Sequence, residues 1–506
     1  MKKLFNGVAL VVGVTCLVWV AVLWQWQRTH RDMSMDDIVV YLVLLPLVAI
    51  ALVFMARWAW RSVQARHAAQ QAARQAAAAA SGAGATATAS GAGGAAAPAA
   101  GAVPQAEAAE RQLAWPVWGV ALQSPGGASA EELLSAAEAL APRPALDDQL
   151  RDAEGAPLMC ARIPDVQPDA LRDAFEAQGG VPDDAVMRAV AALQPVLSDI
   201  LPALRTFVPE SPEAVDASTL PTLQCLLGVP ASWSPDDRER VRAAVVGQLR
   251  DELPPAWPRD AVRLAVCAEG GEAHWRAADD LLVQAQRQQR PVLVLALAAH
   301  SDLSDAAADR LAQARRLFHP GQCPKGHMPG EAAAAVLLAT PSARPPQAPP
   351  GHPSPQALAW LHRPACGQRD KSVDAAGKVS SELLETLFEH ACQAARSTPD
   401  QVAALVCDAD QHSARGTELF GATLARLPQL DAAADLRLTG VVCGGAGAAT
   451  PLVVLAAACA HARAIEHLVL AACVGDPHHR LVALARPLGP EPSAEPAAGT
   501  PPAATS

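Results

Sequence analysis

Two long hydrophobic runs open the chain, ahead of a much longer region of shorter, mixed segments. Leu4–Trp26 contains no charged residue, and Ile38–Ala56 contains none before Arg57 closes it. Each run has about the ~20 residues that a helix needs to cross a bilayer. We therefore predict a transmembrane helical hairpin over residues 1–62, with spans at about 4–26 and 38–57.

The basic residues beside these runs predict the orientation of the hairpin. Lys2 and Lys3 precede the first run, and Arg57 and Arg61 follow the second. Lys and Arg near span ends favour the cytoplasmic side, so both ends of the hairpin are expected there. A cleaved signal peptide is the alternative for the first run, but a second run follows at once. We expect a bacterial-type inner membrane protein with two spans and a cytoplasmic soluble domain.

Low-complexity composition marks two further segments. Residues 63–110 predict an alanine-rich helix and a flexible linker, and residues 489–506 predict a disordered tail. Neither has enough apolar side chains to bury a core. The folded region is therefore expected over 111–488. The eleven cysteines of the chain form no Cys-x-x-Cys pair, which fits a reducing compartment.

Short apolar runs alternate with helical patterns through this region and predict an α/β fold. Pro291–Ala298 is wholly apolar, as in a central strand covered on both faces. Gly or acidic turns follow several runs, so chemistry is expected at the strand ends of one sheet edge. The predicted strands are Val117–Leu122, Val262–Cys267, Pro291–Ala298, Leu358–His362, Val402–Cys407 and Leu436–Cys443.

Charge and motifs exclude several functions. The net charge is −11 and no long basic run lies outside the membrane flanks, which argues against a nucleic-acid partner. The chain lacks the nucleotide, hydrolase and zinc-protease motifs GxxxxGK[ST], GxGxxG after a strand, GxSxG and HExxH, so no cofactor is expected. His319, Cys323 and His327 have a metal-like spacing without a fourth ligand, and no metal site is predicted. Asp408 and Asp410 form an Asp-x-Asp turn, for which an acid–base pair is the alternative reading.

Five stretches occur in a recognisable order between Trp115 and Pro487. They are Val117–Gly127 (VWGVALQSPGG), Phe318–Pro320 with Met328–Leu338, Cys407–Glu418, Gly440–Thr450 and Leu468–Asp476. Together they resemble the β-ketoacyl synthase branch of the thiolase-like superfamily. The resemblance implies a layered α/β/α/β/α domain of two pseudo-repeated halves, which normally dimerises.

The resemblance also implies a catalytic cysteine and two histidines, and this chain departs at both histidines. Alignment on Glu418 puts Cys407, or Asp408 after a one-residue shift, at the first histidine. Alignment on the Gly447-Ala448-Ala449 turn puts Gly444 at the second. Cys267 ends a predicted strand where the family keeps its nucleophile. A buried structural cysteine is the alternative, since nearby glutamates disfavour a thiolate.

The favoured hypothesis is therefore a degenerate, non-catalytic ketosynthase-like protein that acts as a membrane-tethered scaffold or docking component. An envelope or secretion assembly is the candidate setting, with a type VI secretion system as one case. The alternative is an active 3-oxoacyl synthase or acyltransferase on acyl carrier protein or coenzyme A thioesters. That enzyme would need Cys267 and a rearranged base such as His274, His300 or His412. A third hypothesis is a module that binds an acyl chain without turnover. The candidate partners are the membrane, a second copy, acyl carrier protein and a membrane protein complex.

Overall fold

The computed structural model describes residues 109–177, 180–208, 220–253, 257, 262–268, 271–346 and 354–489. All of these lie in the second of two compact units, Ala102–Ser506. The predicted hairpin, most of the predicted linker and the predicted tail lie outside the described residues. Two described helical stretches, Asp184–Arg205 and Gly447–Ile465, are long and apolar enough to cross a membrane. However, 67% of each is buried inside the domain.

One mixed sheet runs through the domain and contains the same strand arrangement twice. We number the five main strands of each half in the order in which they occur along the chain. Their spatial order across the sheet is then third, second, fourth, fifth, first in both halves. The fifth strand is antiparallel to both of its neighbours. The first half, in spatial order, is β5 (Val262–Cys267), β4 (Thr222–Gly228), β6 (Val292–Ser301), β7 (Glu331–Ala339) and β1 (Ala114–Gln123). The second half is β11 (Leu436–Leu438), β10 (Val402–Cys407), β12 (Leu468–Cys473), β13 (His479–Pro487) and β8 (Ala359–His362).

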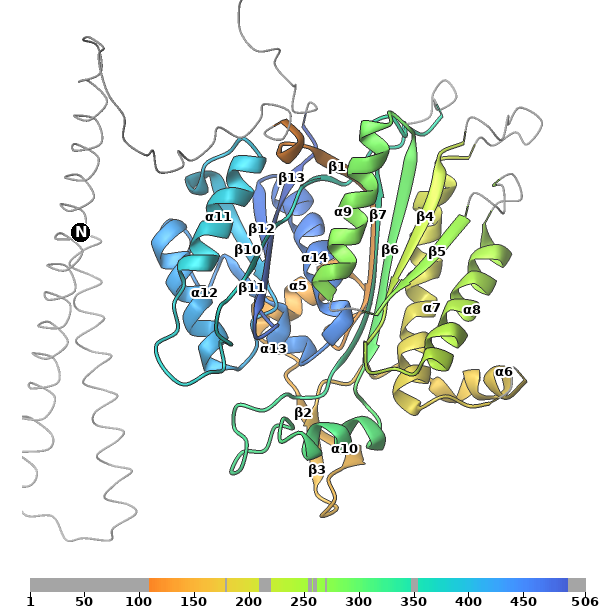
Figure 1. Ribbon diagram of the computed structural model, residues 1–506, viewed down its shortest axis with the longest axis vertical. Coiled ribbons are helices and arrows are strands. Elements are labelled where there is room, and N and C mark those ends of the chain that lie inside the picture. Colours follow the sequence, from red (N-terminus) through yellow and green to blue (C-terminus); the bar gives the residue numbers. More distant parts are fainter. Residues whose placement is uncertain are drawn as a thin grey trace, which may run out of the picture. The chain divides into compact units, whose positions relative to one another are not determined.

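The two halves of the sheet are joined edge to edge, and a shared layer of helices lies between their inner faces. β1 pairs with β8 in antiparallel register, and β9 (Ala365–Gln368) continues past β8 along β13. Five layers result, because helices cover the outer face of each half and others lie between them (Figure 1). The outer helices are α7 (Asp184–Arg205) and α8 (Pro235–Glu252) on one side, and α11 (Glu382–Ala394) and α12 (Ser413–Arg426) on the other. The inner ones are α5 (Ala130–Ala139), α9 (Gly271–Arg287) and α14 (Thr450–Ile465).

This arrangement confirms the predicted thiolase-like α/β/α/β/α fold with two pseudo-repeated halves. Every residue of β6 and β7 is buried, as expected for strands with a helical layer on each face. The central α14 is apolar on nearly all sides, and its alanines let helix and sheets approach closely. Helix α5 begins at a side-chain cap, since Ser129 Oγ accepts the Glu132 backbone N–H at 3.1 Å.

The remaining elements are short. The predicted strand Leu436–Cys443 is wrong beyond Leu438, where the short helix α13 (Thr439–Cys443) follows instead. The chain turns there because the Thr439 hydroxyl donates to the Cys407 carbonyl at 3.2 Å and Gly440 lies directly against the Asp408 backbone. The other elements are β2 (Ala145–Arg151), β3 (Pro157–Cys160), α6 (Arg172–Ala177), α10 (Asp305–Gln313) and the 3-10 turns Pro168–Leu171, Pro399–Gln401 and Gly447–Ala449.

Candidate functional site

The first predicted histidine position lies at the end of β10 and is occupied by buried groups. Cys407 is fully buried, and burial raises the pKa of its thiol well above the usual value. Asp408 accepts the backbone N–H of Val474 at 2.6 Å and that of Gly475 at 3.0 Å. Burial raises the pKa of the Asp408 carboxyl, although these two hydrogen bonds oppose that effect. The carboxylate thus fastens β10 to the turn that follows β12.

The second predicted histidine position, Gly444, is a tight backbone contact. Gly444 ends α13 with φ 59° and ψ −146°, a conformation that favours glycine. A Cβ at Gly444 would lie 3.2 Å from the Ala161 Cβ and 3.2 Å from the Met328 carbonyl oxygen. The next residue, Gly445, donates its N–H to the same Met328 carbonyl at 2.9 Å. A histidine side chain would therefore meet backbone on this side of the turn.

Two histidines from other elements instead pack against this glycine turn. The ring of His327 fills the space beside Gly445, and the ring of His300 fills the space beside Gly447. Both rings contact one carboxylate oxygen, because Asp302 Oδ2 lies 3.1 Å from His300 Nε2 and 2.9 Å from His327 Nε2. Burial alone would raise the pKa of Asp302, but the two histidines hold it well below its usual range. The sequence offered no sign that these three side chains meet.

His319 and His327, which share a metal-like spacing with Cys323, have different partners. The Nδ1 atom of His319 accepts the backbone N–H groups of Gly321 and Gln322 at 3.1 and 3.0 Å. The ring of His327 contacts Asp302 instead. Among the described residues, no group of three or more His, Cys, Asp or Glu side chains is arranged to hold a metal ion.

Glu418 is placed in a buried ion cluster. Its carboxylate accepts from Arg480 Nη2 at 2.8 Å and from Arg369 Nη1 at 2.6 Å. The side chains of Glu418 and Arg480 are both 0% exposed. Arg480 also donates to the carbonyls of Asp476 and His479. Glu418 therefore joins α12 to the start of β13 and to the segment after β9, which is a structural task.

Cys267 is the last residue of β5, and its carbonyl accepts the Val229 N–H at 3.1 Å. Its thiol packs against the central hydrophobic core and is partly exposed. The prediction that Cys267 marks a nucleophile position stays a prediction. Of the proposed substitute bases, His274 is fully buried with Nε2 3.1 Å from the Leu226 carbonyl. Burial lowers its pKa to about 4, so the ring is neutral near pH 7. His412 contacts Asp374 at 3.2 Å, and burial lowers its pKa.

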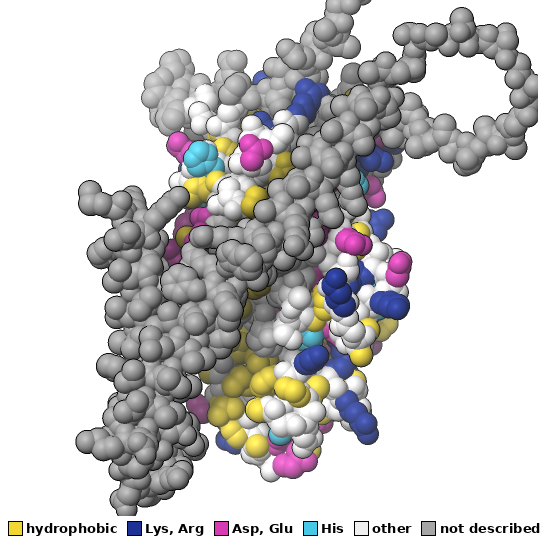
Figure 2. Space-filling view, turned by 90° about the vertical axis from the view of Figure 1, so that its left-hand side faces the viewer, with side chains coloured by type: hydrophobic (Ala, Val, Ile, Leu, Met, Phe, Trp, Pro, Cys, Tyr) yellow, Lys and Arg dark blue, Asp and Glu magenta, His cyan; other side chains and the backbone are white. Residues whose placement is uncertain are grey.

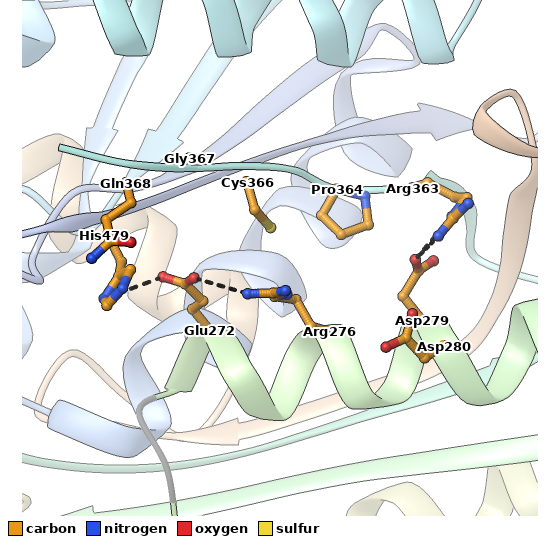
Figure 3. Close-up of a pocket in the computed structure, with 10 residues that line it drawn as sticks. All are labelled: Glu272, Arg276, Asp279, Asp280, Arg363, Pro364, Cys366, Gly367, Gln368 and His479. Atoms are coloured by element: carbon orange, nitrogen blue, oxygen red, sulfur yellow. Dashed lines mark hydrogen bonds and ion pairs between the residues drawn. The ribbon is translucent and has the colours of Figure 1, made fainter. Parts of the chain in front are cut away.

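A cavity of about 390 Å³, which the sequence did not indicate, lies between α9 and β9. Figure 3 shows Glu272, Arg276 and Asp280 of α9 facing Cys366 and Gln368 of β9 across it. The Cys366 side chain points from β9 toward α9 (Figure 3). Burial and the nearby carboxylates raise its pKa to about 12, so it is not a thiolate near pH 7. The cavity can hold a ligand by charge and hydrogen bonding, but it offers no activated nucleophile.

No protein-family model matches the sequence, and no curated protein matches it. Solved structures with similar folds include ketosynthases. The ishigamide ketosynthase/chain length factor is 15% identical, with a TM-score of 0.47, and the match covers 74% of this chain and 100% of the other. A β-ketoacyl synthase from Burkholderia phymatum is 11% identical, with a TM-score of 0.47 and the same coverage.

A third similar structure is a type II PKS ketosynthase in complex with its acyl carrier protein. It is 11% identical, with a TM-score of 0.49, and the match covers 74% of this chain and 99% of the other. Likenesses this distant do not assign an activity. The thiolase-like fold of this chain is therefore established by its own repeated strand order, five layers and registers.

Proposed function

We propose that this protein is a non-catalytic scaffold of thiolase-like fold, tethered to a membrane by its N-terminal hydrophobic runs. The main support is the pair of residues found at the two positions predicted for catalytic histidines. Asp408 is committed to two backbone N–H groups, and Gly444 lies against backbone and the Ala161 side chain. A general acid or base must reach the reacting group with a free proton or lone pair. Asp408 is buried and held in place by its two donors, and Gly444 has no side chain that could carry a proton.

Three further groups, Cys407, Cys366 and His274, also lack activation. Burial raises the pKa of the Cys407 thiol and of the Cys366 thiol, which disfavours their thiolates. His274 is buried and hydrogen-bonded to a main-chain carbonyl. Groups in this condition stabilise a fold, whereas covalent catalysis needs a nucleophile beside a free base.

The setting proposed for this scaffold is the cytoplasmic face of an inner membrane. Residues 4–26 and 38–57 would anchor it there, and a homodimer would present paired domains. The partner would be a membrane protein complex, with a secretion assembly of the type VI kind as one candidate. Exposed apolar side chains support a docking role, since Phe420 and Leu424 lie one turn apart on α12 and are 43% and 59% exposed. Figure 2 also shows hydrophobic side chains gathered on the lower part of the described surface.

The test replaces the one candidate nucleophile. Cys267→Ala in the full chain should leave the cellular phenotype unchanged, with Cys323→Ala as the matched control. Loss of the phenotype in Cys267→Ala, with protein level and thermal unfolding like the control, would overturn the scaffold proposal. Incubation with labelled acyl thioesters and intact mass measurement should show no adduct on Cys267.

One observation favours the second candidate, an acyltransferase or 3-oxoacyl synthase acting on acyl carrier protein or coenzyme A thioesters. His300 and His327 share Asp302 directly beside the Gly444–Gly447 turn. A histidine held by a carboxylate is a common general base. In that case an acyl adduct forms on Cys267, and Asp302→Asn slows its formation or discharge.

A further inference from the structure

Among the described residues, β9 pairs with a strand on one edge only. β8 has neighbours on both edges, since Leu361 pairs with Trp115 of β1 and with Ala485 of β13. β9 follows β8 along the same edge of β13, and β13 is its only strand partner among the described residues. No described strand lies on the other edge of β9, since residues 109–112, just before Leu113, form a helical turn. Next to β9, no described strand therefore fills the position that β1 fills next to β8.

The backbone of β9 presents unpaired groups to that position. The Arg369 N–H donates to the His478 carbonyl at 2.8 Å, so the backbone groups of Arg369 face β13. Direction alternates along a strand, so the N–H and C=O groups of Gln368 and Cys366 point the opposite way. Cavities of about 390 and 520 Å³ flank this edge and share Arg363, Pro364 and Cys366. The first is lined by α9 and the second by α11, and we refer to the two together as the groove along β9.

The groove also contains an acid without a hydrogen-bond donor. Among the described residues, no hydrogen bond ends on the Glu272 carboxylate, and its ion contacts are long. Glu272 lies 3.7 Å from Arg276 and 3.9 Å from His479. Arg276 is 60% exposed, so its contact is weak and screened. Burial raises the pKa of Glu272. Arg363, the other arginine of the groove, is already engaged by Asp279 at 2.8 Å.

We propose that the groove binds an extended segment of a partner polypeptide, which adds to the sheet as a strand beside β9. A Lys or Arg side chain of that segment would donate to Glu272. The unpaired N–H and C=O groups of a strand edge can hydrogen-bond to an extended backbone. A carboxylate without a hydrogen-bond donor favours a cationic side chain beside it. The proposal rests on the docking role proposed above and assigns that role a surface and a partner chemistry.

Fluorescence anisotropy with the full chain in detergent tests this. The probe is the fluorescein-labelled peptide Thr-Val-Lys-Val-Thr with an amidated end. It should bind saturably, and its Lys-to-Glu counterpart should bind at least tenfold more weakly. Glu272→Gln should weaken the lysine peptide about tenfold, the effect of losing one charge-assisted hydrogen bond. Glu131→Gln, an exposed acid in the first turn of α5, is the matched control and should change nothing.

Backbone pairing has its own readout. A strand added at one edge uses alternate amides, so two lysine peptides N-methylated at the odd or the even amides should differ. One should bind like the parent and the other should lose binding. Equal binding by both, equal binding of the Lys and Glu peptides, or no saturable binding by any peptide would each overturn the groove proposal. The scaffold proposal is tested separately by Cys267→Ala and acyl labelling.

Discussion

The buried pair of Glu418 and Arg480 allows the sharpest test of how this domain is held together. Glu418→Gln keeps the shape of the side chain and removes its charge. Arg480 is 0% exposed, so the change leaves a guanidinium in the interior without its counter-charge. Arg369 Nη1, 2.6 Å from the same carboxylate, then adds repulsion where it previously added attraction.

The size of the effect follows from burial. Breaking a buried ion pair by removing one partner costs about 3–5 kcal/mol, because the remaining charge cannot return to water. That corresponds to a factor of roughly 10² to 10⁴ in the folding equilibrium. A further loss is expected because two hydrogen bonds from Arg480 to Glu418, at 2.8 and 3.1 Å, weaken when the acceptor is neutral.

The assay is urea unfolding of the full chain in detergent, followed by tryptophan fluorescence. Glu382→Gln, an exposed acid in the first turn of α11, is the control and should change stability by less than about 0.5 kcal/mol. Replacing both partners, as Glu418→Leu with Arg480→Met, should recover part of the loss. If Glu418→Gln is as stable as the control, the structural role assigned to this cluster is wrong.

Three further predictions follow from the structure. Gly444→His should lower stability by about 1–3 kcal/mol because φ is positive there, and should not create acyl-transfer activity; Gly247→His, which has open space around it, is the control. Trp115→Phe should cost about 1–2 kcal/mol in thermal or urea unfolding, since it deletes the 2.8 Å hydrogen bond to Asp279; an unchanged midpoint would contradict this. The pKa of His274 is about 4 in the fold and 6.5 ordinarily, so the unfolded chain binds the extra proton as the pH falls from 6.5 to 4. Stability should drop over that window by up to about 3 kcal/mol, and His274→Phe should flatten this slope; equal slopes would refute it.

Much of the fold was predictable because the hydrophobic pattern of each segment matches its burial in the layered structure. The wholly apolar stretch Pro291–Ala298 predicted a central strand, and β6 is buried throughout. The strand Leu436–Cys443 was wrong at its end because apolar periodicity cannot distinguish a strand from a short buried helix. The change from strand to helix coincides with a long-range hydrogen bond, which the Thr439 hydroxyl donates to the Cys407 carbonyl.

The site was less predictable, because its groups come from distant segments. The sequence placed Asp408 and Gly444 where the resembled family has histidines, but it did not show what those residues contact. It singled out His300 and His327 for unrelated reasons and gave no sign that both rings meet Asp302. The groove was missed altogether, since it depends on β9 continuing where β1 leaves the sheet.

The sequence by itself determined the alternation of apolar strands with helices that makes an α/β fold, because this depends on residue identity and short-range periodicity. Only the tertiary structure decided which partners each polar side chain contacts. Glu418, predicted as a site position, became the centre of a buried ion cluster through Arg369 and Arg480, which lie 49 and 62 residues away along the chain. Burial and partners fix the charge state and availability of a side chain, and both arise when distant segments pack.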